Sequence, residues 1–225
     1  MKIVPISFKI LGLFDDTEFN EVDGEWLLNR IEQMGRISHR SEDKKTHDSY
    51  DRFLRSVILN HGDWSIAEHA SVTVEAEVDR GITHEIVRHR IAAYTQESTR
   101  FVNYGKKEDG LRFIKPDDLF GQNETRIWEN AMKTAEDSYL ALLMLGKTPQ
   151  IARSVLPNAL ASKIAMTYNL RTWRHFFIMR TSRESHPQMK QLTIPLLAEF
   201  KRVIPILYED IEPEMKQSEA MRLLR

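Results

Sequence analysis

The segment from Arg88 to Arg100 gathers side chains that can bind an anionic small molecule. Its guanidinium, imidazole, amide and hydroxyl groups are carried by Arg88, His89, Arg90, Gln96, Ser98, Thr99 and Arg100. Guanidinium groups bind phosphate through paired hydrogen bonds, and hydroxyl and amide groups add directional donors. The aromatic rings of Tyr94 and Phe101 lie close enough in the sequence to cover a flat ring. The segment therefore predicts a binding site for a phosphorylated small molecule.

The overall charge of the chain indicates that this positive charge is local. The 225 residues include 32 lysines and arginines and 33 acidic residues, which gives a formal net charge of −1. Such a chain has no overall field to attract DNA, RNA or an anionic membrane surface. We therefore expect neither a nucleic-acid partner nor a membrane partner. The apolar stretch at residues 1–5 is too short for a signal peptide, so we expect a cytoplasmic location.

The composition also excludes several kinds of chemistry. The chain contains no cysteine, which rules out disulfides, thiolate metal ligands and a cysteine nucleophile. His84 and His89 are five positions apart, which separates them by about 140° around a helix, whereas the zinc-protease spacing of four gives about 40°. We therefore expect no metal site. Since no glycine-rich phosphate loop is present, side chains must hold any bound nucleotide.

Two further arginines lie on predicted helices. In the helix predicted over 170–182, one stripe at about 100° per residue is formed by Trp173, Phe176, Phe177 and Arg180. Arg180 thus takes a position that suits an apolar side chain. Either its guanidinium reaches out to water, or a bound anion compensates its desolvated charge. Arg153 lies on a short helix between two prolines, and the residues alone favour an ordinary surface arginine there.

The hydrophobic pattern places these residues on the elements of one α+β domain over 1–225. The clearest strand signal covers 70–79, where apolar and polar residues alternate. A helix over 82–89 follows and ends in Arg88-His89-Arg90, while Ser65 with Glu68 fits a helix-capping box ahead of the strand. Further helices are predicted over 18–34, 50–60, 124–145, from Thr148 to Pro157, over 170–182 and 187–208, and in a tail over 208–225. Further strands are predicted over 2–10, near Phe113 and over 161–169.

The order of motifs along the chain resembles that of the flavin-dependent thymidylate synthases. Arg88-His89-Arg90, then seven residues, then Ser98 is the signature of that family. Three further stretches are similar to family motifs in the same order, namely Ser65 to His69, Ala152 to Pro157, and Asn169-Leu170-Arg171 followed by Arg180. The resemblance covers residues 30 to 205.

The resemblance implies an enzyme that converts dUMP to dTMP. Methylenetetrahydrofolate would supply the methylene group and reduced FAD the hydride, with NADPH as the reductant of the flavin. The family does not rely on a cysteine nucleophile, which agrees with a chain that has no cysteine. The implied fold is α+β, a mostly antiparallel sheet flanked by long helices, in a homotetramer with active sites between subunits. The alternative that the residues leave open is a non-catalytic nucleotide- or RNA-binding module that uses the segment Arg88–Arg100.

The resemblance also implies roles for individual residues. The expected flavin-binding residues are Ser65, Glu68, Arg88, His89, Arg90, Gln96, Asn169, Arg171 and His175. The expected dUMP-binding residues are Glu85, Arg88, Gln96, Glu97, Ser98, Thr99, Arg100, Arg153 and Arg180. Arg180 is the expected catalytic residue, because a cation in a dry pocket stabilises negative charge on the uracil ring far better than one in water.

Four positions depart from the residues that are common in that family. Glu85 stands where many members have glutamine, Gln96 where many have glutamate, His175 where some have asparagine, and Asp63 where some have histidine.

Overall fold

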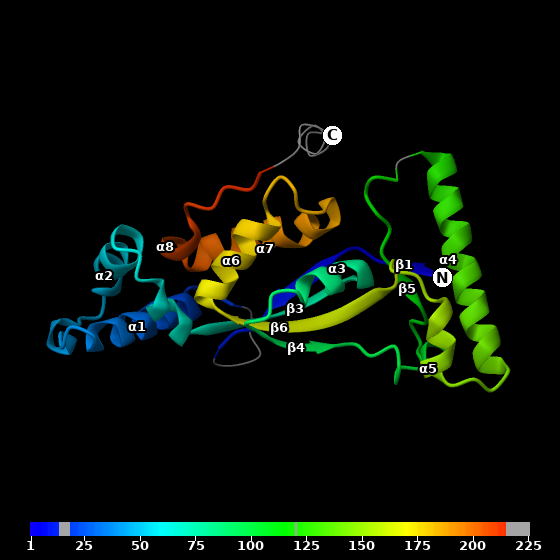
Figure 1. Ribbon diagram of the computed structural model, residues 1–225, viewed down its shortest axis with the longest axis horizontal. Helices are drawn as coiled ribbons and strands as arrows, with labels where there is room; N and C mark the ends of the chain where they lie inside the picture. The colour runs from blue at the N-terminus through cyan, green and yellow to red at the C-terminus, as the bar shows by residue number, and fades with distance from the viewer. Residues whose placement is uncertain (14–18, 120, 215–225) are drawn as a thin grey trace. The chain divides into compact units, whose positions relative to one another are not determined.

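The computed structural model describes residues 1–13, 19–119 and 121–214, and Figure 1 shows its elements. The strands are β1 Lys2–Ile3, β2 Ser7–Ile10, β3 Ser71–Asp79, β4 Ala93–Gln96, β5 Arg112–Phe113 and β6 Ala161–Asn169. The α-helices are α1 Glu21–Ile37, α2 Tyr50–Leu54, α3 Arg80–Ile86, α4 Gln122–Met144, α5 Pro149–Ala152, α6 Leu170–Arg180, α7 Pro187–Val203 and α8 Pro205–Tyr208. Across these ranges, no helix is both long enough and apolar enough to cross a bilayer.

Shorter helical turns connect these elements. The 3₁₀ turns are η1 Glu42–Lys44, η3 Trp64–His69, η4 Tyr104–Lys106 and η5 Arg153–Val155, and the π-helical turn is η2 Arg55–Asn60. The helix predicted over 50–60 is therefore helical throughout but changes from α to π geometry at Arg55.

Four strands form one sheet in the order β2-β3-β6-β4, and β1 and β5 form a separate parallel pair. Strands β3 and β6 are antiparallel, since Leu170 N donates to Ala70 O and Arg80 N donates to Leu160 O, each at 3.0 Å. The apolar residues of the alternating pattern in β3 are all buried: Val72, Val74, Ala76 and Val78. The predicted α+β class with a mostly antiparallel sheet is confirmed.

The described residues form two compact units, each built from three separate stretches of chain. Unit 1 consists of Met1–Ser7, Ala76–Arg88 and Tyr94–Ala165. Unit 2 consists of Phe8–Glu75, His89–Ala93 and the chain from Met166 onward. The single domain over 1–225 stays a prediction, and each unit is described by itself.

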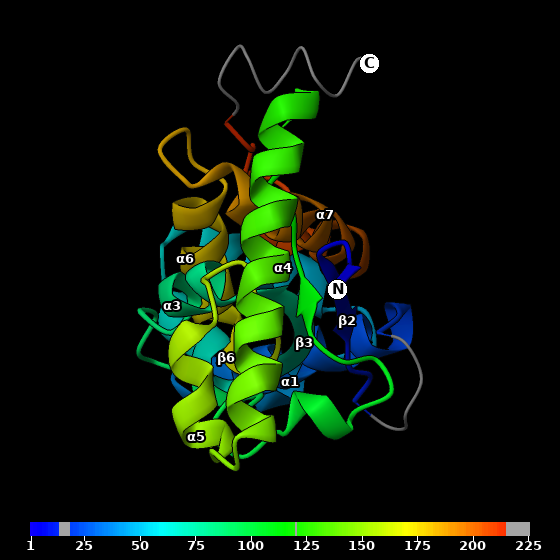
Figure 2. The same cartoon turned by 90° about the vertical axis from the view of Figure 1, so that its right-hand side faces the viewer.

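The core of unit 1 forms where α4 and α5 pack against short irregular segments. Its buried members are Tyr104, Leu111, Phe113, Met132, Tyr139, Ala152 and Leu160. Figure 2 shows α5 beside the C-terminal half of α4. The rings of Tyr104 and Tyr139 meet edge to face with centroids 5.9 Å apart, a favourable arrangement for aromatic pairs. This contact fixes the segment that follows the arginine-rich stretch.

The core of unit 2 is built on the aromatic face of α6. Trp173, Phe176 and Phe177 are fully buried, and Phe200 of α7 and Tyr208 of α8 pack against them. Helices α6 and α7 lie side by side in Figure 1. The stripe that the helical wheel predicts is confirmed for its three aromatic members.

The helix predicted over 82–89 begins and ends earlier than expected. Helix α3 begins at Arg80 because Asp79 Oδ1 accepts a hydrogen bond from Ile82 N at 3.0 Å, which is N-cap geometry. It ends before the arginine-histidine-arginine segment. The expectation that this segment forms the last turn of a helix is therefore wrong.

Prolines divide two other predicted elements. The strand predicted over 2–10 is interrupted between β1 and β2, where Pro5 has no N–H to donate to a neighbouring strand. The helix predicted over 187–208 ends at Val203, and Pro205 begins the separate helix α8.

The remaining differences lie in short or terminal segments. Strand β4 has only four residues, too few for its alternation to stand out in the sequence. The helix predicted from 124 begins at Gln122, where Gly121 N donates to Glu124 Oε2 at 3.1 Å. The helical tail predicted over 208–225 is not helical in 209–214, and its remainder lies outside the described residues.

We expect the substitution Gly24→Ala to destabilise unit 2. An added Cβ would lie 2.3 Å from the backbone oxygen of Val203, so α1 or α7 would have to move. The overpacking should lower the free energy of unfolding by about 1–3 kcal/mol, although alanine favours a helix over glycine by about 1 kcal/mol. Urea unfolding measures the change.

The matched control is Val22→Ala on the exposed face of the same helix. Because Val22 is 66% exposed, the free energy of unfolding should change by less than about 0.5 kcal/mol. If Gly24→Ala were as harmless as this control, the close approach of α1 to Val203 would be disproved.

Candidate functional site

In unit 1, a turn at residues 98–101 brings together two arginines of the predicted site. Ser98 O accepts from Phe101 N at 3.1 Å, and Ser98 Oγ accepts from Arg100 N at 3.3 Å, as hydroxyl side chains commonly do in turns. Arg153 Nη1 donates to Thr99 Oγ1 at 3.3 Å. The turn thus carries Arg100 itself and binds the side chain of Arg153.

Helix α5 supplies a second connection to this turn. Arg100 Nε donates to Gln150 Oε1 at 2.5 Å, and the guanidinium of Arg100 lies 5.2 Å from the ring centroid of Phe101. Arg100 and Arg153 are both exposed, and each guanidinium keeps further N–H donors for a ligand. Two cations beside one turn can bind a phosphate group. Sequence reasoning missed Gln150, although its position on α5, three residues before Arg153, was an available signal.

The side chain of Gln96 is held in a defined orientation. Thr83 Oγ1 donates its proton to Arg80 O at 2.9 Å, so towards Gln96 it can act only as an acceptor. The atom of Gln96 that lies 2.9 Å from Thr83 Oγ1 is therefore the amide nitrogen, Nε2. The same nitrogen lies 3.2 Å from Ser162 Oγ, and Thr83 and Ser162 are fully buried. The amide oxygen of Gln96 is therefore the group that remains to accept a hydrogen bond from a ligand.

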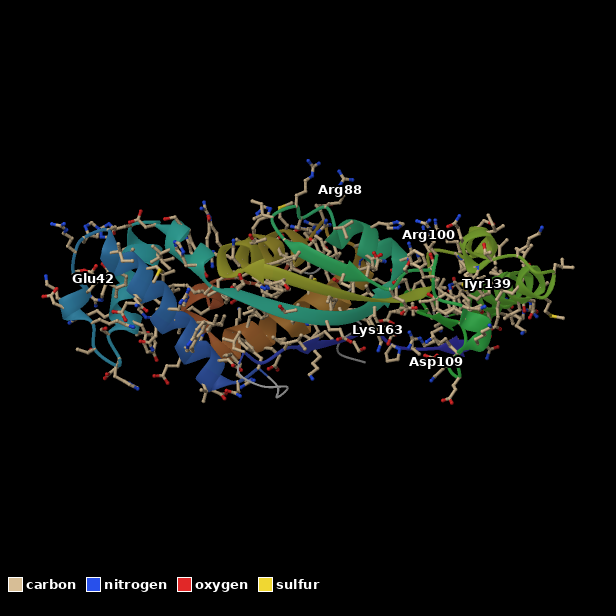
Figure 3. The ribbon with its side chains drawn as sticks, turned by 90° about the horizontal axis from the view of Figure 1, so that it is seen from below. Glu42, Arg88, Arg100, Asp109, Tyr139 and Lys163 are labelled. Atoms are coloured by element: carbon tan, nitrogen blue, oxygen red, sulfur yellow. The ribbon has the colours of Figure 1, made fainter. Side chains whose placement is uncertain are left out.

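The other predicted residues of unit 1 occupy different surroundings. Glu97 binds protein groups, because Tyr104 donates to its Oε1 at 2.6 Å. Glu85 is half-buried on α3. Arg88 follows α3 and is exposed, and Figure 3 shows its side chain projecting away from the ribbon.

In unit 2, Arg180 is held by a histidine. Arg180 Nε donates to His89 Nε2 at 3.0 Å, and the His89 ring meets the Phe176 ring edge to face with centroids 5.0 Å apart. Burial, together with the charges of Arg180 and His175, lowers the pKa of His89 from 6.5 to about 4. His89 is therefore neutral near pH 7 and can accept the hydrogen bond without cancelling the charge of Arg180.

A second arginine of unit 2 is held by a carboxylate. Arg171 Nη1 donates to Glu68 Oε1 at 2.6 Å, with both side chains about half exposed. The capping-box interpretation of Ser65 with Glu68 is wrong, because η3 is a 3₁₀ turn with no side-chain cap. The carboxylate of Glu68 binds Arg171 instead, and the spacing of residues in the sequence could not reveal this contact.

The remaining predicted flavin-binding residues also lie in unit 2. Asn169 Oδ1 accepts from Thr172 N at 2.8 Å and caps α6, which leaves the amide NH₂ group for a ligand. Ser65, Arg90 and His175 are exposed. Arg90 and Arg171 are thus accessible cations that suit a diphosphate-containing cofactor. Across the described ranges, no three histidine or acidic side chains form a group that could hold a metal ion.

The structure divides the predicted site residues between the two units. Unit 1 contains Glu85, Arg88, Gln96, Glu97, Ser98, Thr99, Arg100 and Arg153. Unit 2 contains Ser65, Glu68, His89, Arg90, Asn169, Arg171, His175 and Arg180. Most of the predicted nucleotide-binding residues belong to unit 1, and most of the predicted flavin-binding residues belong to unit 2.

Comparison with known proteins gives consistent matches over most of the chain. The family described as "Thymidylate synthase complementing protein" matches residues 27–206. A flavin-dependent thymidylate synthase of Geobacter sulfurreducens is 36% identical over 158 residues, which cover 69% of this chain and 67% of that protein. The corresponding protein of Corynebacterium glutamicum is 31% identical over 215 residues, which cover 88% of this chain and 85% of that protein.

A solved structure shares the fold. The UMP/dUMP methylase PolB from Streptomyces cacaoi, bound with 5-Br dUMP, superposes with a TM-score of 0.74 over 93% of this chain and 96% of that chain. Its sequence identity is 22%, so this similarity concerns the fold alone.

The neutral state of His89 predicts a specific dependence of stability on pH. The unfolded chain binds a proton near pH 6.5, whereas folded His89 does so only near pH 4. As the pH falls from about 6.5 to about 4, protons therefore favour the unfolded state and the free energy of unfolding decreases. Well above pH 6.5, where His89 is deprotonated in both states, it contributes no pH dependence.

Urea unfolding at pH 7 and pH 5 tests this prediction in the wild type and in His89→Gln. Glutamine retains an acceptor for Arg180 but does not titrate. We expect the wild type to lose more stability than the variant between the two pH values. Equal losses would contradict the assignment of His89 as a buried neutral group.

Proposed function

Because the chain belongs to the flavin-dependent thymidylate synthase family, we propose that it catalyses the reductive methylation of dUMP to dTMP with FAD as its cofactor. Methylenetetrahydrofolate is the proposed carbon donor, and NADPH is the proposed reductant. Membership in this family makes the chain a methyltransferase enzyme, which favours this function over a non-catalytic nucleotide- or RNA-binding module.

The observation that carries the proposal is the pair of arginines at the turn 98–101. Arg153 binds Thr99 of the turn at 3.3 Å, and Arg100 is fixed by Gln150 at 2.5 Å. In the proposed complex, the two guanidinium groups bind the phosphate of dUMP through charge-assisted hydrogen bonds. The hydroxyl of Ser98 adds a donor, and the amide oxygen of Gln96 faces the nucleoside as an acceptor.

Arg180 is the proposed catalytic residue. It is half-buried at the end of a fully buried aromatic face, and His89 fixes its Nε. A preorganised cation in a site of low dielectric constant stabilises negative charge that develops on a pyrimidine ring during the reaction. Since His89 is neutral near pH 7, it orients the guanidinium without placing a charge of its own beside it.

The residues present fit a flavin dinucleotide. In unit 2, the exposed cations Arg90 and Arg171 suit its diphosphate, and Glu68 fixes Arg171 at 2.6 Å. When bound, the flavin supplies the hydride of the reductive methylation. The 225 residues contain no cysteine, so the protein offers no thiolate to attack the pyrimidine.

We also propose a homotetramer with active sites between subunits. Apolar side chains beside the nucleotide-binding turn are exposed, namely Phe101 at 77% and Ile151 at 53%, and a second copy of the chain would cover them. Light scattering should give a mass of four chains of 26.3 kDa each. A monomer in solution would contradict this part of the proposal. The cytoplasmic location stays a prediction.

The reaction itself provides the first test. We expect the purified protein to show the absorbance spectrum of a flavin. It should form dTMP only when dUMP, methylenetetrahydrofolate and NADPH are all supplied. A colourless protein that gains no activity after incubation with FAD would refute the proposed function.

The variant Arg180→Ala tests the catalytic role. Loss of one preorganised charge should reduce kcat for dTMP formation by about 10²- to 10³-fold, while the flavin content of the purified protein stays near that of the wild type. Arg180→Lys serves as the control that retains the charge but not the geometry of the guanidinium. Its kcat should lie between those of the wild type and Arg180→Ala. Undiminished turnover by Arg180→Ala would disprove the role.

The variant Ser98→Ala tests the division between nucleotide and flavin residues. We expect KM for dUMP to rise about tenfold, which corresponds to the loss of one hydrogen bond to a charged group. Flavin absorbance should not change, because Ser98 is assigned to the nucleotide. Loss of flavin with unchanged affinity for dUMP would reverse the assignment.

A further inference from the structure

The carboxylate of Glu97 is occupied by two protein groups. Tyr104 donates to Oε1 at 2.6 Å, and Arg112 Nη2 lies 3.5 Å from Oε2. The side chain of Glu97 is only 16% exposed, and its backbone N donates to Lys163 O of β6 at 2.8 Å. Both the backbone and the side chain of Glu97 are therefore fixed, directly before the turn 98–101.

Tyr104 is anchored in the core of unit 1. It is 4% exposed, its ring packs edge to face on Tyr139 of α4, and its backbone N lies 3.3 Å from Tyr139 Oη. Burial, together with the hydrogen bond to Glu97, raises the pKa of Tyr104 well above its ordinary value. The phenol therefore keeps its proton and acts as a hydrogen-bond donor at every physiological pH.

Arg112 is also held in place. Its Nη2 lies 3.1 Å from Glu77 Oε1 on β3, and its Nη1 lies 2.9 Å from Asp109 Oδ2. Arg112 and Glu97 have equally small exposures of 16%. A cation shared by two partly buried carboxylates compensates their desolvation, so Arg112 partners the carboxylate of Glu97 from within the protein.

These contacts give Glu97 a different role from direct binding of the substrate. An ionised carboxylate close to a phosphate dianion would repel it. Here both oxygens of that carboxylate are directed at Tyr104 and Arg112. The adjacent residues on either side, Gln96 and Ser98, carry the groups assigned to the nucleotide.

We infer that Glu97, Tyr104 and Arg112 form a clamp that positions the turn 98–101 for nucleotide binding, so that Glu97 is a positioning residue and not a ligand of dUMP. The inference rests on the proposed function. The clamp connects the turn to α4 through Tyr104 and to β3 through Arg112. It holds Ser98 and Arg100 in the geometry that the phosphate requires before the nucleotide arrives.

Steady-state kinetics of Glu97→Ala and Tyr104→Phe test the clamp. Each variant should raise KM for dUMP about tenfold, equivalent to about 1.4 kcal/mol of lost binding. In both, kcat should change by less than about twofold and the flavin content should stay constant. Tyr104→Phe keeps the buried ring and removes only the hydroxyl, so it tests the clamp even if Glu97→Ala does not fold.

Two further variants separate positioning from a general structural effect. Glu97→Gln retains an oxygen acceptor for Tyr104 and should recover most of the affinity for dUMP. The substitution Asp109→Asn alters the third acidic partner of Arg112, and the side chain of Asp109 is 42% exposed. It should leave KM for dUMP unchanged, because exposed ion pairs contribute little. The double variant Glu97→Ala/Tyr104→Phe should have a KM for dUMP no higher than that of the more impaired single variant, since both substitutions remove the contact between Glu97 and Tyr104.

The outcomes separate failure of the clamp from failure of the proposed function. If the wild type turns over dUMP and both single variants keep its KM, the clamp is disproved alone. A large fall in kcat at unchanged KM would also overturn it, because Glu97 would then act on the reacting groups. A wild type that neither binds dUMP in calorimetry nor converts it would overturn both proposals.

Discussion

A guanidinium group kept half-buried at the end of an aromatic helix face is the constraint on which the candidate site depends. Arg180 follows three fully buried aromatic residues on α6, so the packing of those rings determines where its charge lies. The contact with His89 orients this group, and burial keeps the imidazole neutral near pH 7. His89 therefore fixes the guanidinium without placing a charge of its own beside it.

The turn at residues 98–101 orients its cations in a similar way, with different groups. A glycine-rich loop binds phosphate with backbone N–H groups at a helix N-terminus, whereas the site proposed for this chain would use side chains from two segments. Flexible arginines bind well only if their conformations are restricted beforehand. Gln150 restricts Arg100, and Thr99 binds Arg153. The protein thus limits the freedom of both cations with neutral partners, which do not themselves cancel their positive charge.

Much of the fold could be predicted from the sequence where the periodicity was long. The alternation in 70–79 predicted β3, and the helical wheel placed Arg180 beside the buried rings of α6. Short elements gave no such signal, as the four residues of β4 illustrate. A local pattern also misled where a tertiary contact was stronger. Ser65 with Glu68 matches a capping box, but Glu68 binds Arg171, which is distant in the sequence.

The candidate site was predictable in its residue types but not in its connections. The cluster of charges in 88–100 indicated an anion site without any structure. Arg153 by itself looked like a surface residue, and only the resemblance to a family gave it a role before the structure placed it beside Thr99. No spacing rule connects Glu97 to Tyr104 and Arg112, because these contacts depend on how the segments pack in unit 1.

The interleaving of the two units has a consequence for how such a protein can change over time. Each unit is assembled from three stretches of chain, and β3 contributes residues to both. No contiguous piece of the chain forms either unit, so the insertion of one continuous segment into another protein cannot transfer either of them. Point substitutions and changes in loop length remain compatible with such a discontinuous arrangement, because they leave all three stretches of each unit in one chain.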